Sequence, residues 1–169
     1  YRLMAEQTDY PLHLGVTEAG TRHMGLLKSA AAFGALLADG IGDTLRVSLT
    51  ADPVEEVYAA LDILKALGLH SQGAVMISCP TCGRTKVNLI PIAEEVERRL
   101  AGLKSRVTVA VMGCAVNGPG EAREADLGVA CGADEGLIFA KGEIIGKAPA
   151  EKIVEALAEQ VMLLTGERI

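Results

Sequence analysis

The sequence predicts an α/β fold with two differently organised halves. In residues 1–72, two short apolar strands are each followed by a segment of helical periodicity, an order typical of parallel sheets. In residues 73–169, β-branched strands and a hairpin signal accompany two helices, which indicates an α+β unit. Half of the residues are hydrophobic and only 3% are aromatic, so the expected core consists of Ala, Val, Leu and Ile.

The first half contains two predicted βα units. An apolar strand over 12–16 precedes a helix over 25–37, which Asp39-Gly40 stops. A second strand over 44–49 precedes a helix that Asp52-Pro53 opens. We expect the buried stripe of this helix to comprise Val54, Val57, Leu61, Leu64 and Leu67. Two parallel strands cannot cover both faces of a sheet, so we expect truncation or completion of the sheet by another chain.

The second half is predicted to hold three or four strands and two helices. A strand over 75–78 leads into the first cysteine pair, a helix covers 89–103, and a β-branched strand runs over 107–112. Further short strands are predicted over 126–130, 137–140 and 143–145, with Lys141-Gly142 as a hairpin turn and a last helix from Pro149.

Composition narrows the possible partners and compartment. The net charge of −6 argues against a general nucleic-acid binder. No apolar run approaches the roughly 18 residues that a membrane span needs, so we expect no membrane partner. Four cysteines in an acidic chain rich in Leu and Ala are more typical of the cytoplasm than of a secreted disulfide framework.

Three cysteines follow two predicted strands. Cys79 and Cys82 form a Cys-x-x-Cys pair after the first strand of the second half, and Cys114 follows the next strand along the chain. Soft thiolates select iron–sulfur clusters or zinc. The cysteine spacing is compatible with three kinds of site: an iron–sulfur site, a zinc site closed by Cys131, or a thioredoxin-like redox pair. We expect Cys131 to be a small buried residue of a strand and not a ligand.

Four further side chains are candidates on weaker grounds. Glu121 ends a loop rich in glycine and proline, where it is either a metal ligand or a solvated carboxylate. Glu18 follows the first strand, where α/β enzymes place catalytic groups, although a capping or ion-paired role is equally compatible. Arg46 and Ser48 alternate along the second strand and suit a phosphate, unless Arg46 pairs with an acidic neighbour.

Four separate motifs, in order along the chain, resemble those of the 4-hydroxy-3-methylbut-2-enyl diphosphate synthase family. They lie at residues 14–20 (LGVTEAG), 40–49 (GIGDTLRVSL), 78–84 (SCPTCGR) and 113–122 (GCAVNGPGEA). The resemblance implies the last two βα units of a TIM-type barrel over residues 1–72, followed by a sulfite-reductase-like α+β domain over residues 73–169.

The resemblance also implies a cofactor and an activity. A [4Fe–4S] cluster would be held by Cys79, Cys82, Cys114 and Glu121. The family enzyme opens 2-C-methyl-D-erythritol 2,4-cyclodiphosphate by two-electron reduction in the methylerythritol phosphate pathway of isoprenoid biosynthesis. Glu18 would be the acid/base of this reaction, and Arg46 and Ser48 would hold the diphosphate.

The implied partners are reduced flavodoxin or ferredoxin as electron donor and a second copy of the chain, in a bacterial cytoplasm. Because six further βα units would complete such a barrel, we expect this chain alone not to turn over substrate. The alternative function, from another class, is a non-catalytic interaction module stabilised by zinc or a cluster.

Overall fold

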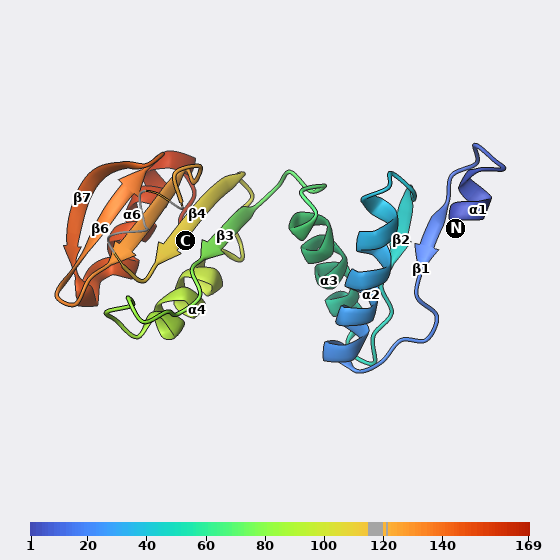
Figure 1. Cartoon of the computed structure of the whole chain (residues 1–169), viewed down its shortest axis with the longest axis horizontal. Helices are drawn as coiled ribbons and strands as arrows, with labels where there is room; N and C mark the ends of the chain where they lie inside the picture. The colour runs from blue at the N-terminus through green and yellow to red at the C-terminus, as the bar shows by residue number, and fades with distance from the viewer. Residues whose placement is uncertain (115–119, 121) are drawn as a thin grey trace. The chain divides into compact units, whose positions relative to one another are not determined.

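The computed structural model describes residues 1–114, 120 and 122–169. The chain divides into two compact units, unit 1 at Tyr1–Ser71 and unit 2 at Gln72–Ile169 (Figure 1). Together the units form a mixed α/β chain with one small and one larger sheet. None of the helices in the described part of the chain has the length and apolar character needed to cross a bilayer.

Unit 1 is built on two short parallel strands. A short helix, α1 (Arg2–Ala5), precedes β1 (His13–Gly15), α2 (Arg22–Leu37), β2 (Thr44–Arg46) and α3 (Pro53–Ala66). The order after α1 is the predicted strand–helix–strand–helix, and β1 pairs with β2 in parallel. The second strand is shorter than the prediction of 44–49, because β1 ends at Gly15 and leaves β2 without a partner beyond Arg46.

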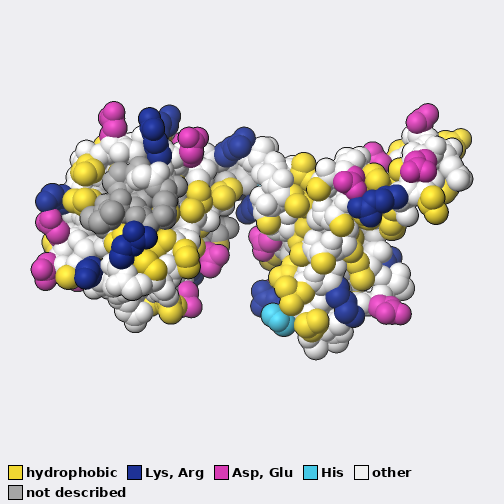
Figure 2. Space-filling view, viewed as in Figure 1, with side chains coloured by type: hydrophobic (Ala, Val, Ile, Leu, Met, Phe, Trp, Pro, Cys, Tyr) yellow, Lys and Arg dark blue, Asp and Glu magenta, His cyan; other side chains and the backbone are white. Residues whose placement is uncertain are grey.

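The start of α3 follows the prediction, but its buried face does not. The Asp52 carboxylate accepts a hydrogen bond from the Val54 amide at 2.9 Å and caps the helix. Val54 and Val57 are 56% and 58% exposed, whereas Ala59 and Ile63, on nearly the opposite face, are buried. The prediction for Val54 and Val57 is wrong because no described element packs against their side of the helix. Figure 2 shows hydrophobic side chains spread over the visible face of this unit.

The described part of unit 2 contains one sheet of five strands, one at each predicted strand range, although three or four strands were expected in total. The strands are β3 (Ala74–Ser78), β4 (Val107–Met112), β5 (Leu127–Cys131), β6 (Glu135–Ala140) and β7 (Glu143–Pro149), and they lie in sequence order across the sheet. The first three are parallel, and β6 and β7 are antiparallel to their neighbours. The carboxyl ends of β3, β4 and β5 therefore lie at one edge, which is the edge that bears the cysteines.

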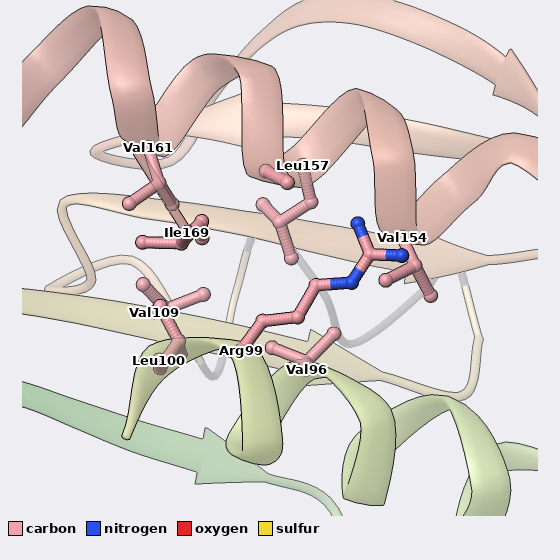
Figure 3. Close-up of a pocket in the computed structure, with 9 residues that line it drawn as sticks. Val96, Arg99, Leu100, Val109, Val154, Leu157, Val161 and Ile169 are labelled. Carbon is pink, nitrogen blue, oxygen red and sulfur yellow. The ribbon is translucent and has the colours of Figure 1, made fainter. Parts of the chain in front are cut away.

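Two helices, α4 (Leu89–Leu100) and α6 (Ile153–Thr165), pack with one face of this sheet in the main hydrophobic core. A short 3-10 helix, η1 (Ala150–Lys152), leads into α6. In Figure 3, Val96 and Val109 meet Leu157 and Val161 between the two helices and β4. The space left among these side chains is only about 10 Å³, barely that of one water molecule, so this is packed core and no ligand site.

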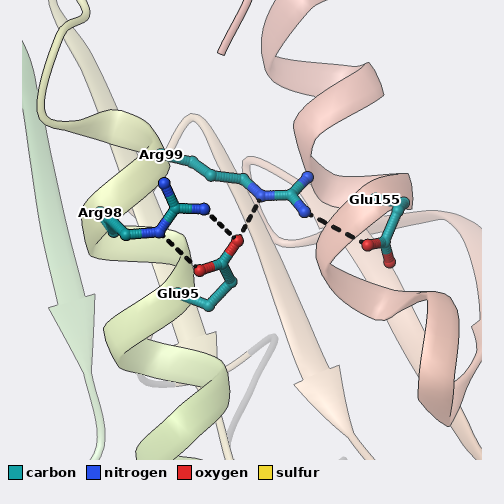
Figure 4. Close-up of polar contacts among 4 residues, drawn as sticks. All are labelled: Glu95, Arg98, Arg99 and Glu155. Atoms are coloured by element: carbon teal, nitrogen blue, oxygen red, sulfur yellow. Dashed lines mark hydrogen bonds and ion pairs between the residues drawn. The ribbon is translucent and has the colours of Figure 1, made fainter.

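An ion-pair network ties α4 to α6 at the surface above that core (Figure 4). The Glu95 carboxylate accepts hydrogen bonds from Arg98 at 2.6 Å and Arg99 at 2.8 Å, one helical turn further along α4. Arg99 also reaches Glu155 of α6 at 3.2 Å. Arg98 first, and then Arg99, lower the pKa of Glu95 to about 2. The carboxylate is therefore charged over the whole physiological range, and it holds Arg99, which makes the contact to α6.

The opposite face of the sheet has a second, smaller core that depends on a glycine. Gly128 of β5 lies directly across from Phe139 of β6, and a Cβ atom at Gly128 would overlap the Phe139 ring and approach the Ala110 Cβ to 2.9 Å. Phe139 is fully buried because it occupies the space that this glycine leaves. The close approach makes a side chain at position 128 sterically unacceptable.

We therefore expect Gly128→Ala to destabilise the chain by about 1–3 kcal/mol, the usual cost of overpacking a core. Gly146→Ala is the matched control in the same sheet, because no atom lies within 4 Å of the added Cβ. Urea unfolding followed by circular dichroism measures both free energies. Equal stability of the two variants would contradict this account of the second core.

Candidate metal centre

The first cysteine is fixed to the neighbouring strand by its backbone and its sulfur. The Cys79 amide donates to the Val111 carbonyl at 3.3 Å, which extends the β3–β4 pairing one residue past the end of β3. The Gly113 amide in turn donates to the Cys79 Sγ at 3.2 Å. Cys114, the next residue, therefore lies at the same edge of the sheet as Cys79, although 34 positions separate Gly113 from Cys79.

The segment between the cysteine pair and α4 folds back toward the second cysteine loop. A turn at Cys82 is closed by the Thr85 amide, which donates to the Cys82 carbonyl at 3.0 Å. The Lys86 amide then donates to the Gly113 carbonyl at 3.3 Å. The two cysteine loops are therefore linked by hydrogen bonds through both the amide and the carbonyl of Gly113.

The three candidate ligands differ in exposure. Cys114 is buried, Cys79 is half-buried and Cys82 is exposed. The backbone and side-chain N–H groups of Arg84 lower the pKa of the Cys82 thiol. A lowered pKa favours the thiolate, which is the form that binds metals and reacts with electrophiles.

Cys131 has a different environment, as the sequence predicts. Its side chain is fully buried in the core that β5 shares with α4 and α6. Burial, with a smaller effect of Cys79, raises the pKa of the Cys131 thiol to about 11. The prediction that Cys131 is a buried residue of a strand is confirmed. A neutral, enclosed thiol is a poor metal ligand.

The donor set is suited to a soft metal or a cluster, since its thiols come from two linked loops at one edge. Among the described residues, however, no three Cys, His, Asp or Glu side chains are already gathered to hold a metal ion. Glu121 and most of the loop that precedes it, residues 115–119, lie outside the described residues. A groove of about 180 Å³ between β3 and α4 has Cys79 in its wall.

Two residues beside the cysteines, Thr85 and Gly113, are not among the site residues predicted from the sequence. Thr85 and Gly113 contact each other where the two loops meet, and neither bears an obvious catalytic group. A glycine immediately before a cysteine, at the end of a strand, is the signal that could have identified one of them. The threonine bears no such signal.

Unit 1 places its candidate residues at the carboxyl ends of its two strands. Glu18 follows β1, and the Lys28 ammonium donates to its backbone carbonyl at 3.1 Å. Arg46 is the last residue of β2 and pairs with Gly15, over which its guanidinium lies. No described residue forms an ion pair with Arg46, so the acidic neighbour considered above is not found in that part of the chain. Ser48 lies beyond the end of β2 and is half-buried.

Two family models match the chain, one for each unit. The model described as the GcpE TIM-barrel domain matches residues 1–61. The model described as the GcpE protein C-terminal domain matches residues 75–163. The second match alone covers more than half of the chain.

Curated relatives are similar over nearly the whole chain. A protein of Geobacter sulfurreducens is 60% identical over 168 residues, which are 99% of this chain and 48% of that protein. Relatives from Clostridium perfringens and Bacillus subtilis are 62% identical over 93% of the chain and 55% identical over 99%, covering 45% and 44% of their own lengths. All three are named 4-hydroxy-3-methylbut-2-en-1-yl diphosphate synthase (flavodoxin). The chain spans about half the length of these relatives.

The environments of the four cysteines predict an order of reactivity. In metal-free, reduced protein, iodoacetamide should modify Cys82 first and Cys131 only after unfolding, because one is exposed and the other enclosed. Arg84→Gln should shift the pH–rate profile of Cys82 partway to higher pH, because it removes the side-chain hydrogen bond and charge that lower the Cys82 pKa but keeps the Arg84 backbone amide, which lowers it most.

Peptide mass spectrometry at several times and pH values measures these rates. Lys86→Gln is the matched control, because it removes a nearby positive charge that is not among the causes of the Cys82 shift. If Cys131 of the folded protein were modified as fast as Cys82, the description of Cys131 as enclosed and Cys82 as exposed would be wrong.

Proposed function

This chain belongs to the GcpE family, and from that premise we propose that it works in the reaction for which its relatives are named. That reaction reduces 2-C-methyl-D-erythritol 2,4-cyclodiphosphate to 4-hydroxy-3-methylbut-2-enyl diphosphate, taking up two electrons and two protons and releasing one water. The observation that carries the proposal is the joining of two cysteine loops at one sheet edge, in a chain so similar to these enzymes.

The cofactor of the proposal is a [4Fe–4S] cluster held by Cys79, Cys82, Cys114 and Glu121. The sulfur donors at the shared edge support it, and so does the contrast between those thiols and the enclosed Cys131. Such a cluster supplies single electrons, which no side chain of the chain can provide. The exposed Cys82 and the buried Cys114 would place the cluster between solvent and the protein interior.

Unit 1 would supply acid/base and phosphate-binding groups from the last two βα units of a barrel. Arg46 donates from a planar fork that suits a phosphate, and it lacks an acidic partner among the described residues. Ser48 would add a hydroxyl to the same phosphate. Glu18 would move a proton at the substrate, from the strand end where barrel enzymes place such groups. Two strands form only part of such a barrel, so substrate turnover would need more than unit 1 supplies.

The proposed partners follow from the relatives and from the resemblance. The relatives' names indicate flavodoxin as the electron donor, and a ferredoxin is the alternative carrier. A second copy of the chain would complete a homodimer. Residues 73–169 would form a domain like that of sulfite reductases, residues 1–72 the barrel portion, and the enzyme would work in the bacterial cytoplasm.

The cluster is tested by anaerobic reconstitution of this chain with iron and sulfide. We expect brown protein with about four irons per chain and a paramagnetic signal on reduction. Cys114→Ser should abolish iron binding, and Cys131→Ser, the matched control, should retain it. Stoichiometric zinc that requires Cys131 would instead favour the interaction module.

The activity is tested in a chimera in which this chain replaces the matching half of the Geobacter sulfurreducens relative, which is 60% identical to it. With reduced flavodoxin the chimera should convert the cyclic diphosphate, and product is measured by chromatography. Glu18→Gln should lower kcat by about 10²–10⁴, the usual contribution of a general acid or base.

Arg46→Gln in the same chimera should mainly raise KM, because the side chain is proposed to bind a phosphate. Arg22→Gln removes an arginine of unit 1 that is paired with Glu55, and it serves as the control. Full activity of the Glu18→Gln chimera would refute the acid/base role.

A further inference from the structure

One glycine lies at the point where the two cysteine loops meet. Gly113 donates its amide to the Cys79 Sγ at 3.2 Å and accepts from the Lys86 amide at 3.3 Å. Both of its backbone polar groups are therefore used to join the loops.

The side chain of Thr85 covers this glycine. A Cβ atom at Gly113 would lie 2.8 Å from the Thr85 Cγ2 and 3.0 Å from its Oγ1, closer than a side chain tolerates. The next nearest atom is the Leu89 Cδ2 at 3.3 Å, the end of a flexible side chain that can shift. Thr85 is therefore the residue that must shift first if a side chain is added at position 113.

The requirement for glycine is steric and not conformational. Gly113 is not among the residues of the described chain with positive φ, so alanine can adopt its backbone without strain. The main obstacle to an alanine is the threonine side chain, whose Cγ2 is the nearest atom to the added Cβ. This makes the contact between Thr85 and Gly113 separable from the rest of the fold by substitution.

We propose that Gly113 and Thr85 are a positioning pair that sets the spacing of the two cysteine loops and directs an amide at the Cys79 sulfur. The part that concerns a bound cluster rests on the proposed function. An N–H donor to a ligand sulfur stabilises its negative charge, which raises the reduction potential of the centre it binds. In this proposal both residues act through the Cys79 side chain, which they position as a ligand.

Three variants test the pair: Gly113→Ala, Thr85→Ala and the double variant. The added methyl group of Gly113→Ala should push the loops apart, weaken the amide–sulfur hydrogen bond and expose the half-buried Cys79. In metal-free protein, iodoacetamide should then modify Cys79 faster, as measured on its peptide by mass spectrometry. The double variant should return to the rate of Thr85→Ala, because removal of the threonine side chain restores the space.

The second readout is the reconstituted protein. Gly113→Ala should lower iron retention against a chelator by about tenfold, as loss of an outer-shell contact commonly does, and should lower the midpoint potential. In the double variant, both the iron retention and the midpoint potential should return toward those of Thr85→Ala. Gly83→Ala is the matched control, since Gly83 directly follows Cys82 in the first cysteine loop and nothing lies within 4 Å of its added Cβ.

The two readouts separate this inference from the proposed function. If wild-type protein binds no iron, the cluster proposal fails, and the Cys79 modification rates still decide the role of the pair. Wild-type rates in Gly113→Ala, or a double variant no better than Gly113→Ala, would overturn the inference.

Discussion

The parallel pairing of β3 with β4 is the constraint on which the candidate site depends. Parallel strands end at the same edge of a sheet, so two loops that are distant in sequence emerge side by side. The pairing here continues past Ser78 through the Cys79 amide and finishes with the Gly113 amide on the Cys79 sulfur. The same interaction that completes the sheet thus brings Cys79 and Cys114 to the same end of these two strands.

The environments that the fold provides give four chemically identical cysteines different properties. Cys82 is exposed beside Arg84 and has a lowered pKa, whereas Cys131 is enclosed in the main core and has a raised one. Three cysteines lie in or next to the two loops at the sheet edge, and the fourth belongs to the core of β5. This distribution favours a site of three thiolates over one that uses all four.

The end of the sheet that bears the cysteine loops is stabilised by the core that α4 and α6 form with the sheet. Val96, Leu157 and Val161 bury the face of the sheet beneath α4 and α6, and each fully buried side chain of this size contributes roughly 1.5–3 kcal/mol. The Glu95–Arg99–Glu155 contacts link the two helices at the surface. Because α4 follows directly on the first cysteine loop, its fixed position also fixes the end of that loop.

The local sequence by itself determined the strands and helices with strong periodicity or clear end signals, and it singled out the cysteine motifs. The strand at β4 matches its prediction because its β-branched residues favour extended backbone. Asp52-Pro53 marks the start of α3 because its cap is a local interaction. Only the tertiary structure decided which face of α3 is buried, that the strands of the second half share one sheet, and which glycine links the cysteine loops. Val54 and Val57 have the right spacing for a core, but burial depends on what packs against them, and that partner is not encoded in the helix. The contact of Thr85 with Gly113 likewise exists only because strand pairing brings two distant loops together.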